Sequence, residues 1–498
     1  MSLRAPGGCT RTSHPTRRTR RTPVQFTDRT ILVRSQHVVV LPHGANHIVY
    51  HSLLGNPTVV DEPVLALLHA FETPTSVGTA RAQRPSRNFL RRVRTFTDAG
   101  FLVRRGTDER AAIRRRVQLT LDRARRGENL MALGLILDEA CNFGCDFCLA
   151  RKLAETSGRQ TTVRKMPWPV AQVAIDALVV AARAHGHKTV EIYFGGREPL
   201  LNWEVLQRSI EYALDTYGKS LTFRFSTNTN CSLITKERAR FIAKHRILVT
   251  TSLDGLAEAN DSVRTHVSGR GTFAEIIAGW DHLARVRRPI RMISLTLTEG
   301  NIDRIDGSYF DFLASRGIRT CTVEPDLIAS LHRSPADVVD VLFRLRALGH
   351  DRGITVTGMW EKPFNAMIPS PKPKYHNTFA CNAFSGTGLN VLPSGAITAC
   401  SYSAQQVGTL EAFPSVLSSD GYTKLAASRA VGNIEACIGC EIEGVCRGGC
   451  YLTHEYGENT GSSAGVHYRC EIYRLATRAL LLEAASDNAS DNSTDGRR

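Results

Sequence analysis

The sequence predicts an α/β fold whose centre is a partial (β/α)6 barrel of parallel strands. Short apolar segments alternate with longer helical ones over residues 133–324, and polar clusters follow several of the apolar segments. Parallel strands need long crossover connections, usually a helix, so this alternation is typical of a parallel sheet. The 498 residues also exceed the usual size of one domain, so further domains are expected on either side.

Six strands and five helices are expected in this centre. The strands are placed at residues 133–137, 189–194, 221–226, 248–253, 291–297 and 318–324, and the helices near 170–185, 203–217, 235–245, 273–287 and 302–316. In barrels of parallel strands the chemistry lies at the carboxyl ends of the strands, where loops converge. Residues that directly follow the strands are therefore the first candidates for a site.

The first strand runs into three cysteines, Cys141, Cys145 and Cys148, with the spacing CxxxCxxC. Three thiolates hold only three corners of a [4Fe–4S] cluster, which leaves one iron without a protein ligand. The motif resembles the signature of the radical S-adenosylmethionine (SAM) superfamily, with the aromatic Phe147 before the last cysteine. The resemblance implies that SAM binds the open iron and is cleaved to methionine and a 5′-deoxyadenosyl radical. For these three cysteines alone, a zinc knuckle is the alternative.

The segment after the second strand, residues 194–201, is similar to the GGEP motif of the same superfamily, which contacts the amino group of SAM. Gly195, Gly196 and Glu198 are the candidates that follow from this similarity. The segment departs from the motif because Arg197 stands between glycine and glutamate. It therefore stays open whether Glu198 or only the glycine backbone binds the cofactor.

Two further strand ends resemble segments that hydrogen-bond the ribose and carboxylate of SAM. The candidates are Ser226 and Asn228 after the third strand and Ser252 after the fourth. Ordinary Asx turns and helix caps are the structural alternative for such residues. The candidate proton acceptors for the reaction are Glu324, Asp326 and Tyr402, among which nothing in the sequence selects.

The last third of the chain contains seven more cysteines, with Gly395 between the first two. They are Cys381, Cys400, Cys437, Cys440, Cys446, Cys450 and Cys470. This order resembles the SPASM domain of radical SAM enzymes that mature peptides, and seven ligands exceed what one zinc ion needs. The resemblance implies two auxiliary [4Fe–4S] clusters, one held by Cys437, Cys440, Cys446 and Cys470 and the other by Cys381, Cys400 and Cys450.

The second auxiliary cluster lacks one thiol ligand. Cys231 and Cys321 are expected to be buried small side chains rather than ligands, and Cys9 has no assigned role. That cluster is therefore expected to be open, for example to substrate, or to take a ligand other than cysteine. Residues 378–473 also show little evident core, so metal binding is expected to supply much of their folding free energy.

Residues 29–106 are expected to form a small winged-helix-like domain. The expected elements are strands at 38–41 and 47–50 around a Pro42-His43-Gly44 turn, helices at 61–71 and 87–99, and a strand at 101–103. Asp61 is the expected N-cap of the first helix, and Gly100 ends the second. This order is similar to precursor-peptide recognition domains of peptide-modifying radical enzymes, which implies that a leader peptide adds as a strand to the sheet edge. DNA binding is the competing interpretation.

Positive charge is concentrated at the N-terminal end. Up to Arg126 the sequence has 23 Arg, no Lys and 8 acidic residues, which accounts for most of the net charge of +16. An arginine-rich surface favours an acidic leader peptide. The full expected organisation is a disordered basic tail over 1–28, the recognition-like domain over 29–106, a basic linker helix over 107–130, the barrel over 131–350, a bridging region and SPASM domain over 351–483, and a disordered tail over 484–498.

The expected function is modification of a ribosomally synthesised precursor peptide, a crosslink or an oxidation that begins with hydrogen abstraction by the deoxyadenosyl radical. The expected cofactors are SAM and three [4Fe–4S] clusters, and the expected electron donor is a flavodoxin or ferredoxin. The sequence shows neither a membrane-spanning apolar run nor a secretory signal, so a cytoplasmic protein with reduced thiols is expected.

Two alternatives to this function stay open. Anaerobic sulfatase-maturating enzymes share most of these motifs, but they resemble one another in an aspartate after the cysteine at the place of Cys400, where this chain has Ser401. A cluster-containing, redox-sensing DNA-binding regulator is the alternative from another class, and it predicts salt-sensitive duplex binding. The radical SAM resemblance argues against nucleic acid as the main partner.

Overall fold

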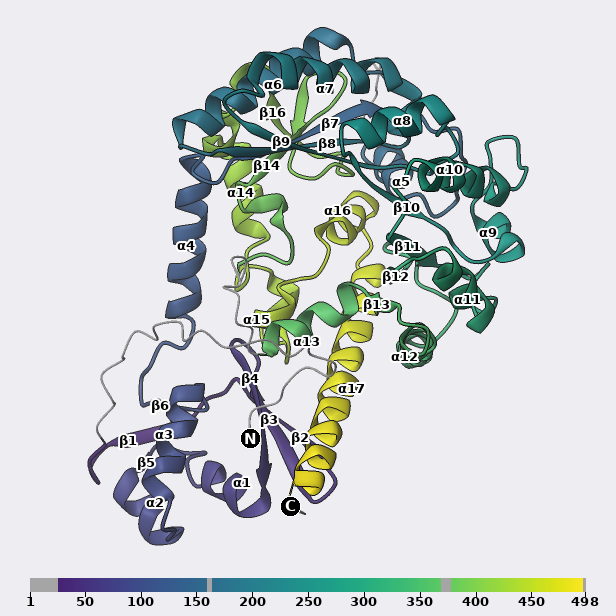
Figure 1. Ribbon diagram of the computed structural model, residues 1–498. Coiled ribbons are helices and arrows are strands. Elements are labelled where there is room, and N and C mark those ends of the chain that lie inside the picture. Colours follow the sequence, from purple (N-terminus) through teal and green to yellow (C-terminus); the bar gives the residue numbers. More distant parts are fainter. Residues whose placement is uncertain (1–25, 159–163, 369–377, 496–498) are drawn as a thin grey trace.

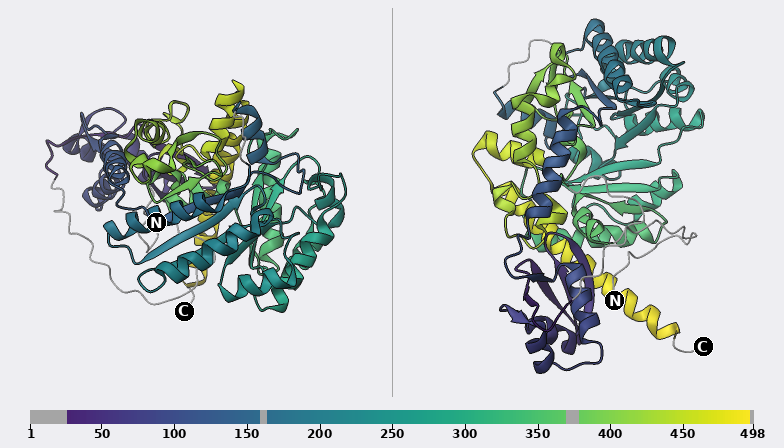
Figure 2. Two further views of the ribbon diagram at one scale, coloured as in Figure 1. Left: turned by 90° about the horizontal axis from the view of Figure 1, so that it is seen from above. Right: turned by 90° about the vertical axis from the view of Figure 1, so that its left-hand side faces the viewer.

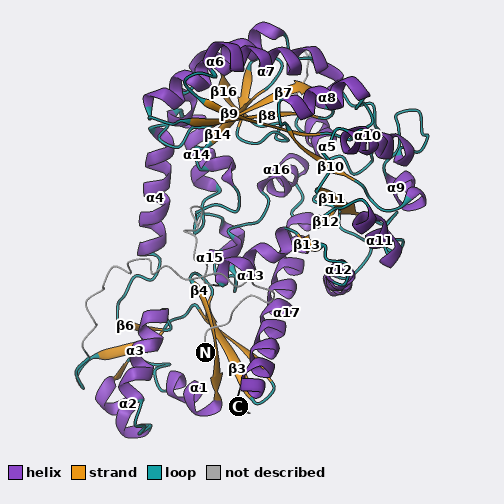
Figure 3. Ribbon diagram, in the orientation of Figure 1, coloured by secondary structure: helices purple, strands orange, loops and turns teal. Residues whose placement is uncertain are grey.

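A ten-stranded sheet forms the centre of the molecule (Figures 1 and 3). The computed structural model describes residues 26–158, 164–368 and 378–495. The strand order is β13-β12-β11-β10-β9-β8-β7-β14-β15-β16. The bounds are β7 Ala132–Asp138, β8 Thr189–Gly196, β9 Thr222–Asn228, β10 Leu248–Ser252, β11 Met292–Leu297, β12 Thr320–Pro325, β13 Thr355–Thr357, β14 Gly388–Val391, β15 Ala396–Thr398 and β16 Gln406–Thr409.

The six expected strands are confirmed as β7 to β12, and each is parallel to its neighbours. This establishes the predicted partial barrel. The sheet continues beyond the prediction at both edges, because β13 pairs in parallel with β12 and β14 pairs in parallel with β7. The cysteine-rich part of the chain is therefore joined to the barrel through one continuous sheet.

Helices pack along the outside of this sheet (Figure 2). They are α5 Leu149–Thr156, α6 Trp168–Ala184, α7 Trp203–Tyr217, α8 Lys236–Lys244, α9 Ala257–Val263, α10 Phe273–Arg285, α11 Gly307–Ser315 and α12 Pro335–His350. The helix expected over 302–316 begins later, at Gly307. Asp306 is its N-cap and accepts a hydrogen bond from the backbone N–H of Ser308, so the preceding residues form turns instead.

The N-terminal domain contains two three-stranded sheets and its own apolar core. The sheets are β5-β1-β6 and β2-β3-β4, with β1 Ile31–Arg34, β2 Val38–His43, β3 Asn46–His51, β4 Gly55–Asp61, β5 Thr75–Ser76 and β6 Leu102–Arg104, and the helices are α1 Glu62–His69, α2 Val77–Gln83 and α3 Phe89–Ala99. The Asp61 cap and the left-handed Gly100 at the end of α3 are as expected. Strands β1, β4 and β5 and helix α2 were not predicted.

Two long helices join the parts of the molecule (Figure 1). Helix α4, Ala111–Arg125, is more than a linker, because Ile113, Val117 and Leu121 on one face are buried. Helix α17, Ala464–Asp495, runs from the cysteine-rich part to β2 and β3. The expectation of disorder from residue 484 is wrong for this helix, because Ala484 and Ala485 are buried.

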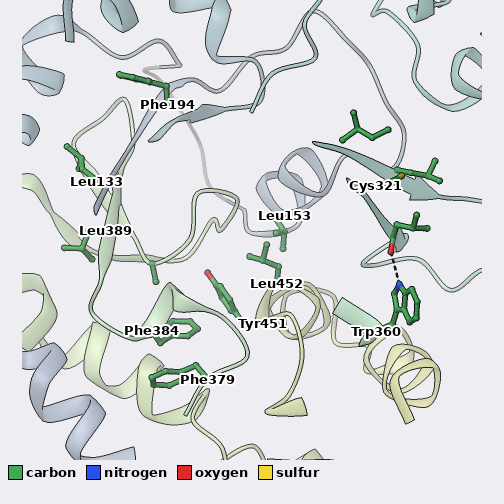
Figure 4. Close-up of a cluster of buried hydrophobic side chains, with 14 of the residues drawn as sticks. Leu133, Leu153, Phe194, Cys321, Trp360, Phe379, Phe384, Leu389, Tyr451 and Leu452 are labelled. Atoms are coloured by element: carbon green, nitrogen blue, oxygen red, sulfur yellow. Dashed lines mark hydrogen bonds between the residues drawn. The ribbon is translucent and has the colours of Figure 1, made fainter. Parts of the chain in front are cut away.

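The cysteine-rich part also has more core than expected. Its elements are η2 Met359–Glu361, α13 Lys362–Met367, η3 Asn382–Phe384, α14 Asp420–Ser428, α15 Glu443–Cys446 and α16 Tyr451–Thr460. Phe379, Phe384 and Tyr451 pack together, and Leu452 faces Leu153 of the barrel (Figure 4). The barrel and this part therefore share one buried cluster. None of the helices in the described ranges is long and apolar enough to cross a membrane.

Candidate active site

The three cysteines of the CxxxCxxC motif lie on the loop between β7 and α5. All three line a cavity of about 350 Å³. The other walls come from the carboxyl ends of neighbouring strands, with Gly196 from β8, Asn228 from β9 and Ser252 from β10. The structure thus brings these expected residues together at the edge of the sheet where parallel strands end.

Three of the six expected cofactor residues, Gly195, Ser226 and Glu198, do not line this cavity. Gly195 lies on β8, where an added Cβ would stand 2.5 Å from the ring of Tyr193, so its small size serves packing. Ser226 lies further back on β9. Gly196 has a φ of +130°, and an added Cβ would stand 2.3 Å from the carbonyl oxygen of Asp138. This position accepts only glycine, because a side chain would collide with the backbone of Asp138 on β7.

Glu198 lies behind the cavity rather than in its wall, and it is completely buried. Its carboxylate accepts hydrogen bonds from the Thr229 hydroxyl at 2.7 Å and from the Asn230 backbone N–H at 2.8 Å. The Asn230 amide in turn donates to Asn142 at 2.9 Å and contacts the Cys141 sulfur at 3.8 Å. Glu198 therefore holds the loop that supports the cysteines, while burial raises its pKa to about 6.

A buried ion pair that the sequence did not reveal supports the same loop. Arg264 contacts Asp254 at 2.7 Å, and the Asp254 side chain is fully buried. The Arg264 guanidinium also donates to the Cys145 sulfur at 3.8 Å and lies 5.2 Å from the centre of the Phe147 ring. Only the position of Asp254, directly after the β10 strand end, was a signal in the sequence; Arg264 follows a short helix ten residues later.

The comparisons with known proteins agree with this geometry. The model of the radical SAM superfamily matches residues 135–307, which contain the three cysteines and the strand ends around them. The chain contains a radical SAM domain. Its radical SAM domain binds a [4Fe–4S] cluster and SAM, and the cavity beside Cys141, Cys145 and Cys148 offers the thiols and polar groups that these require.

Relatives cover most of the chain. The radical SAM cyclopropyl synthase TigE from Paramaledivibacter caminithermalis is 25% identical over 465 residues, which are 90% of this chain and 96% of the relative. The mycofactocin maturase MftC from Mycobacterium ulcerans is 29% identical over 36% of this chain and 43% of its own. The solved structure of native anSMEcpe with bound AdoMet shares the fold with a TM-score of 0.56 at 17% identity, covering 71% of this chain and 99% of that one.

Of the three candidate proton acceptors in this radical SAM enzyme, Asp326 and Tyr402 line the 350 Å³ cavity. The Tyr402 hydroxyl accepts a hydrogen bond from the Asn228 amide at 3.1 Å. One Asp326 oxygen accepts from the backbone N–H groups of Ile328 and Ala329. Glu324 does not line the cavity. Burial raises its pKa to about 7.

A second cavity of about 320 Å³ adjoins the first. The two share Ala150, Arg151, Gly196, Arg197 and Tyr402 as lining residues. Ser401 and Ser403 line the second cavity from the cysteine-rich part. The radical SAM site therefore has room beside the cofactor for part of a substrate.

The seven C-terminal cysteines fall into two spatial groups. Cys446 interacts electrostatically with Cys437, Cys440 and Cys470, whereas Cys400 interacts with Cys381 and Cys450. No three His, Cys, Asp or Glu side chains of the described ranges stand close enough for a single metal ion. The ligands of an iron–sulfur cluster are spaced more widely, because each binds a different iron.

The chemistry of these thiols fits a cluster. Burial raises the pKa of Cys400 and Cys437 to about 12, so bound cationic iron would be needed to keep them as thiolates. Cys231 and Cys321 are also completely buried, and burial raises their pKa to about 12. Cys231 lies beside Thr251 and Trp280, and Cys321 lies beside Tyr309, away from both groups.

The N-terminal domain contacts the loop that carries Cys437, Cys440 and Cys446. Arg110 forms two hydrogen bonds, of 2.5 and 2.8 Å, with the buried carboxylate of Glu443. The backbone N–H of Gly444 donates to the Ser52 carbonyl at 2.9 Å. An added Cβ at Gly444 would stand 2.0 Å from the carbonyl oxygen of Leu53, so the two backbones touch.

Proposed function

We propose that this enzyme modifies a side chain of a ribosomally synthesised precursor peptide. The observation that carries the proposal is the direct packing of a peptide-recognition-like N-terminal domain on the cysteine-rich part of a radical SAM enzyme. The similarity to TigE over 96% of that relative's length supports it, because TigE is named a radical SAM cyclopropyl synthase. MftC, named a mycofactocin maturase, adds support over 36% of this chain.

Cys141, Cys145 and Cys148 would hold the cluster that binds SAM, and Gly196, Asn228, Ser252 and Arg264 would surround SAM. When bound, the cluster and SAM supply a deoxyadenosyl radical that abstracts a hydrogen atom from the substrate. Arg264 is charged and faces the cavity, so it can bind a carboxylate while Asp254 holds its guanidinium. Asp326 and Tyr402 are the groups in the wall that can take a proton from the substrate.

The N-terminal domain would bind the leader of the peptide. Strand β6 lies at one edge of the sheet β5-β1-β6, where another strand can add through backbone hydrogen bonds. The neighbouring surface is basic, with exposed Arg91, Arg94, Arg104 and Arg105 on or after α3 and β6. An acidic leader would therefore be attracted to this edge.

The two groups of C-terminal cysteines would hold two auxiliary [4Fe–4S] clusters. Such clusters can accept the electron that a substrate radical loses when it is oxidised. A flavodoxin or ferredoxin would supply the electron for SAM cleavage, and a reducing compartment such as the cytoplasm would keep the thiols free to bind the clusters.

Sulfatase maturation is the second candidate. A cysteine-type anaerobic sulfatase-maturating enzyme from Clostridium novyi is 20% identical over 67% of this chain and 90% of its own length. Against this candidate, Ser401 follows Cys400, and a hydroxyl is a much weaker base than the aspartate expected there. The N-terminal recognition-like domain is a further feature that a sulfatase substrate does not explain.

The test is an anaerobic assay of the reconstituted enzyme with SAM, a reductant and a precursor peptide encoded beside its gene. We expect a change in peptide mass and formation of 5′-deoxyadenosine, both lost when the leader is removed. Modification of a sulfatase peptide alone would favour the second candidate. Tight, salt-sensitive duplex binding without SAM cleavage would favour the DNA-binding regulator.

A further inference from the structure

Three side chains near Cys450 bury polar atoms that have no hydrogen-bond partner in the part of the chain that the structure describes. These atoms are Glu324 Oε2, Arg469 Nε and Nη1, and the Tyr473 hydroxyl. The charges of Glu324 and Arg469 both affect the pKa of Cys450. The pKa of Tyr473 is in turn affected by Glu324, Arg469 and Cys450. Buried polar groups are nearly always paired, so a group with matching chemistry is expected between them.

The cluster expected in this region lacks a fourth thiol ligand. Cys381, Cys400 and Cys450 form a group of three thiols, whereas the neighbouring group has four. Cys231 and Cys321 are buried elsewhere, and Cys9 lies outside the described residues. A fourth ligand from the described chain must therefore be a side chain other than cysteine.

Of the two carboxylate oxygens of Glu324, one is hydrogen-bonded and the other has no hydrogen-bond partner among the described residues. Its Oε1 accepts a hydrogen bond from the backbone N–H of Met359, which leaves Oε2 free. Met359, Cys381 and Tyr473 line one cavity of about 290 Å³, together with Cys446 of the neighbouring group. Glu324 does not line this cavity but is hydrogen-bonded to one of its lining residues, Met359.

Other carboxylates nearby are already engaged. Glu455 accepts hydrogen bonds on both oxygens, from the Ser403 hydroxyl and from the backbone N–H groups of Ala404 and Gln405. Glu361 faces Arg346, with 3.5 Å between Oε1 and Nε. Of Glu324, Glu361 and Glu455, Glu324 is thus the one that combines a buried oxygen without a hydrogen-bond partner among the described residues with an electrostatic effect on Cys450.

We propose that Glu324 Oε2 is the fourth ligand of the cluster held by Cys381, Cys400 and Cys450, and that Arg469 and Tyr473 donate hydrogen bonds to that cluster. The proposal rests on the auxiliary clusters of the proposed function. A carboxylate ligand donates less charge than a thiolate, and the two donors stabilise the reduced cluster further. Both features raise the reduction potential of this cluster above that of its four-cysteine neighbour.

The test uses the full chain with Cys141, Cys145 and Cys148 replaced by alanine, so that only the auxiliary clusters are observed. We expect about eight irons per chain in this parent. Glu324→Gln should lose about one iron and give the electron paramagnetic resonance signal of a [3Fe–4S] cluster after mild oxidation. Glu324→Cys should restore the iron and lower the potential of one cluster. Glu361→Gln, the matched control on η2, should behave as the parent.

The proposal is overturned if Glu324→Gln keeps the iron content and spectrum of the parent, or if the parent itself already gives the three-iron signal. Should Glu324→Gln fail to fold, the parent labelled with ¹³C-glutamate decides the question. Electron–nuclear double resonance of its reduced clusters should show coupling to a carboxylate carbon, absent from Glu324→Cys. A parent without that coupling excludes the ligand. None of these measurements needs peptide or SAM, so they are independent of the peptide-modifying function.

Discussion

The two sets of cysteines in this enzyme differ in how far apart their members lie in the sequence. Cys141, Cys145 and Cys148 lie within one short loop after a buried strand, so a single element of the barrel positions them. The other seven come from separate segments, from Cys381 before η3 to Cys470 on α17. A cluster at the first site would bind residues of a single loop. Clusters at the second site would cross-link segments that lie far apart in the sequence. We therefore expect the first set to serve chemistry and the second to serve folding as well.

The contacts that hold the two sets of cysteines in position also differ in whether they are local or come from another part of the molecule. The first loop is held from within the barrel, by the Asn142–Asn230 hydrogen bond and the Asp254–Arg264 ion pair. The loop of the second set is held partly from outside the cysteine-rich part, through Arg110 at the start of α4 and through Ser52 of the N-terminal domain. Local changes in the N-terminal domain should thus reach the auxiliary site more easily than the SAM site.

The largest expected effect comes from removing ligands of each set. Cys437→Ser with Cys446→Ser should lower the free energy of unfolding by about 5 kcal/mol or more, because metal binding contributes directly to folding. Cys141→Ser with Cys145→Ser should abolish 5′-deoxyadenosine formation and change stability much less. Anaerobic thermal unfolding followed by circular dichroism measures both. Equal losses of stability in the two variants would remove the distinction.

A smaller effect is expected at the ion pair that supports the first set. Arg264→Met leaves the carboxylate of Asp254 buried without its partner, which should cost about 3–5 kcal/mol. SAM cleavage should fall as well, since Arg264 lines the cavity. Denaturant unfolding gives the first quantity and 5′-deoxyadenosine formation the second.

Arg304→Met is the matched control, because Arg304 and Glu258 form an exposed pair with 3.6 Å between them. That substitution should change stability by no more than about 1 kcal/mol. A loss in Arg264→Met as small as in the control would mean that the buried pair does not support the cysteine loop.

What the sequence predicted well is what depends on neighbouring residues. The six strands follow from apolar runs, and the Asp61 cap and the Gly100 end of α3 follow from local backbone chemistry. The grouping of Asn228 and Ser252 with the cysteines follows from the rule that parallel strands end at one edge.

The features that escaped prediction depend on contacts between distant residues. Arg264 reaches Cys145 across 119 positions, and Glu198 faces away from the cavity because Thr229 and Asn230 bind it. The end of α17 is polar by composition, yet it is helical because the preceding turns bury Leu480 and Leu481. Composition cannot reveal such partners, since the residues concerned look ordinary on their own.

An intermediate effect is expected where the N-terminal domain supports the second set. Arg110→Ala removes two hydrogen bonds to the buried Glu443 carboxylate, so it should destabilise the protein by about 2 kcal/mol. Arg114→Ala is the control, because Arg114 and Asp108 form an exposed pair. Thermal unfolding and proteolysis between the domains compare the two variants. Similar behaviour of both would show that the junction does not depend on this pair.

The smallest expected effect is a pH dependence at the same junction. His37 is buried next to His51, at 5.5 Å between ring centres, and accepts or donates a hydrogen bond with Ser52. Burial lowers its pKa below the usual 6.5. Glu109 and Glu443 oppose this shift to a smaller extent, whereas the positive charges of His51 and Arg110 lower the pKa further. The unfolded chain therefore takes up a proton before the folded one, and stability falls as pH drops below 6.5.

The size of this loss should be about 1 kcal/mol between pH 6.5 and 5.5, since one proton is linked to unfolding. Hydrogen exchange of the β2 and β3 amides, corrected for the intrinsic rate at each pH, measures it where it acts. His37→Gln should flatten the dependence, because glutamine cannot titrate, while His350→Gln on the exposed end of α12 should leave it unchanged. Protection that stays constant across this range in the unsubstituted enzyme would show that the junction with the second set of cysteines is insensitive to His37.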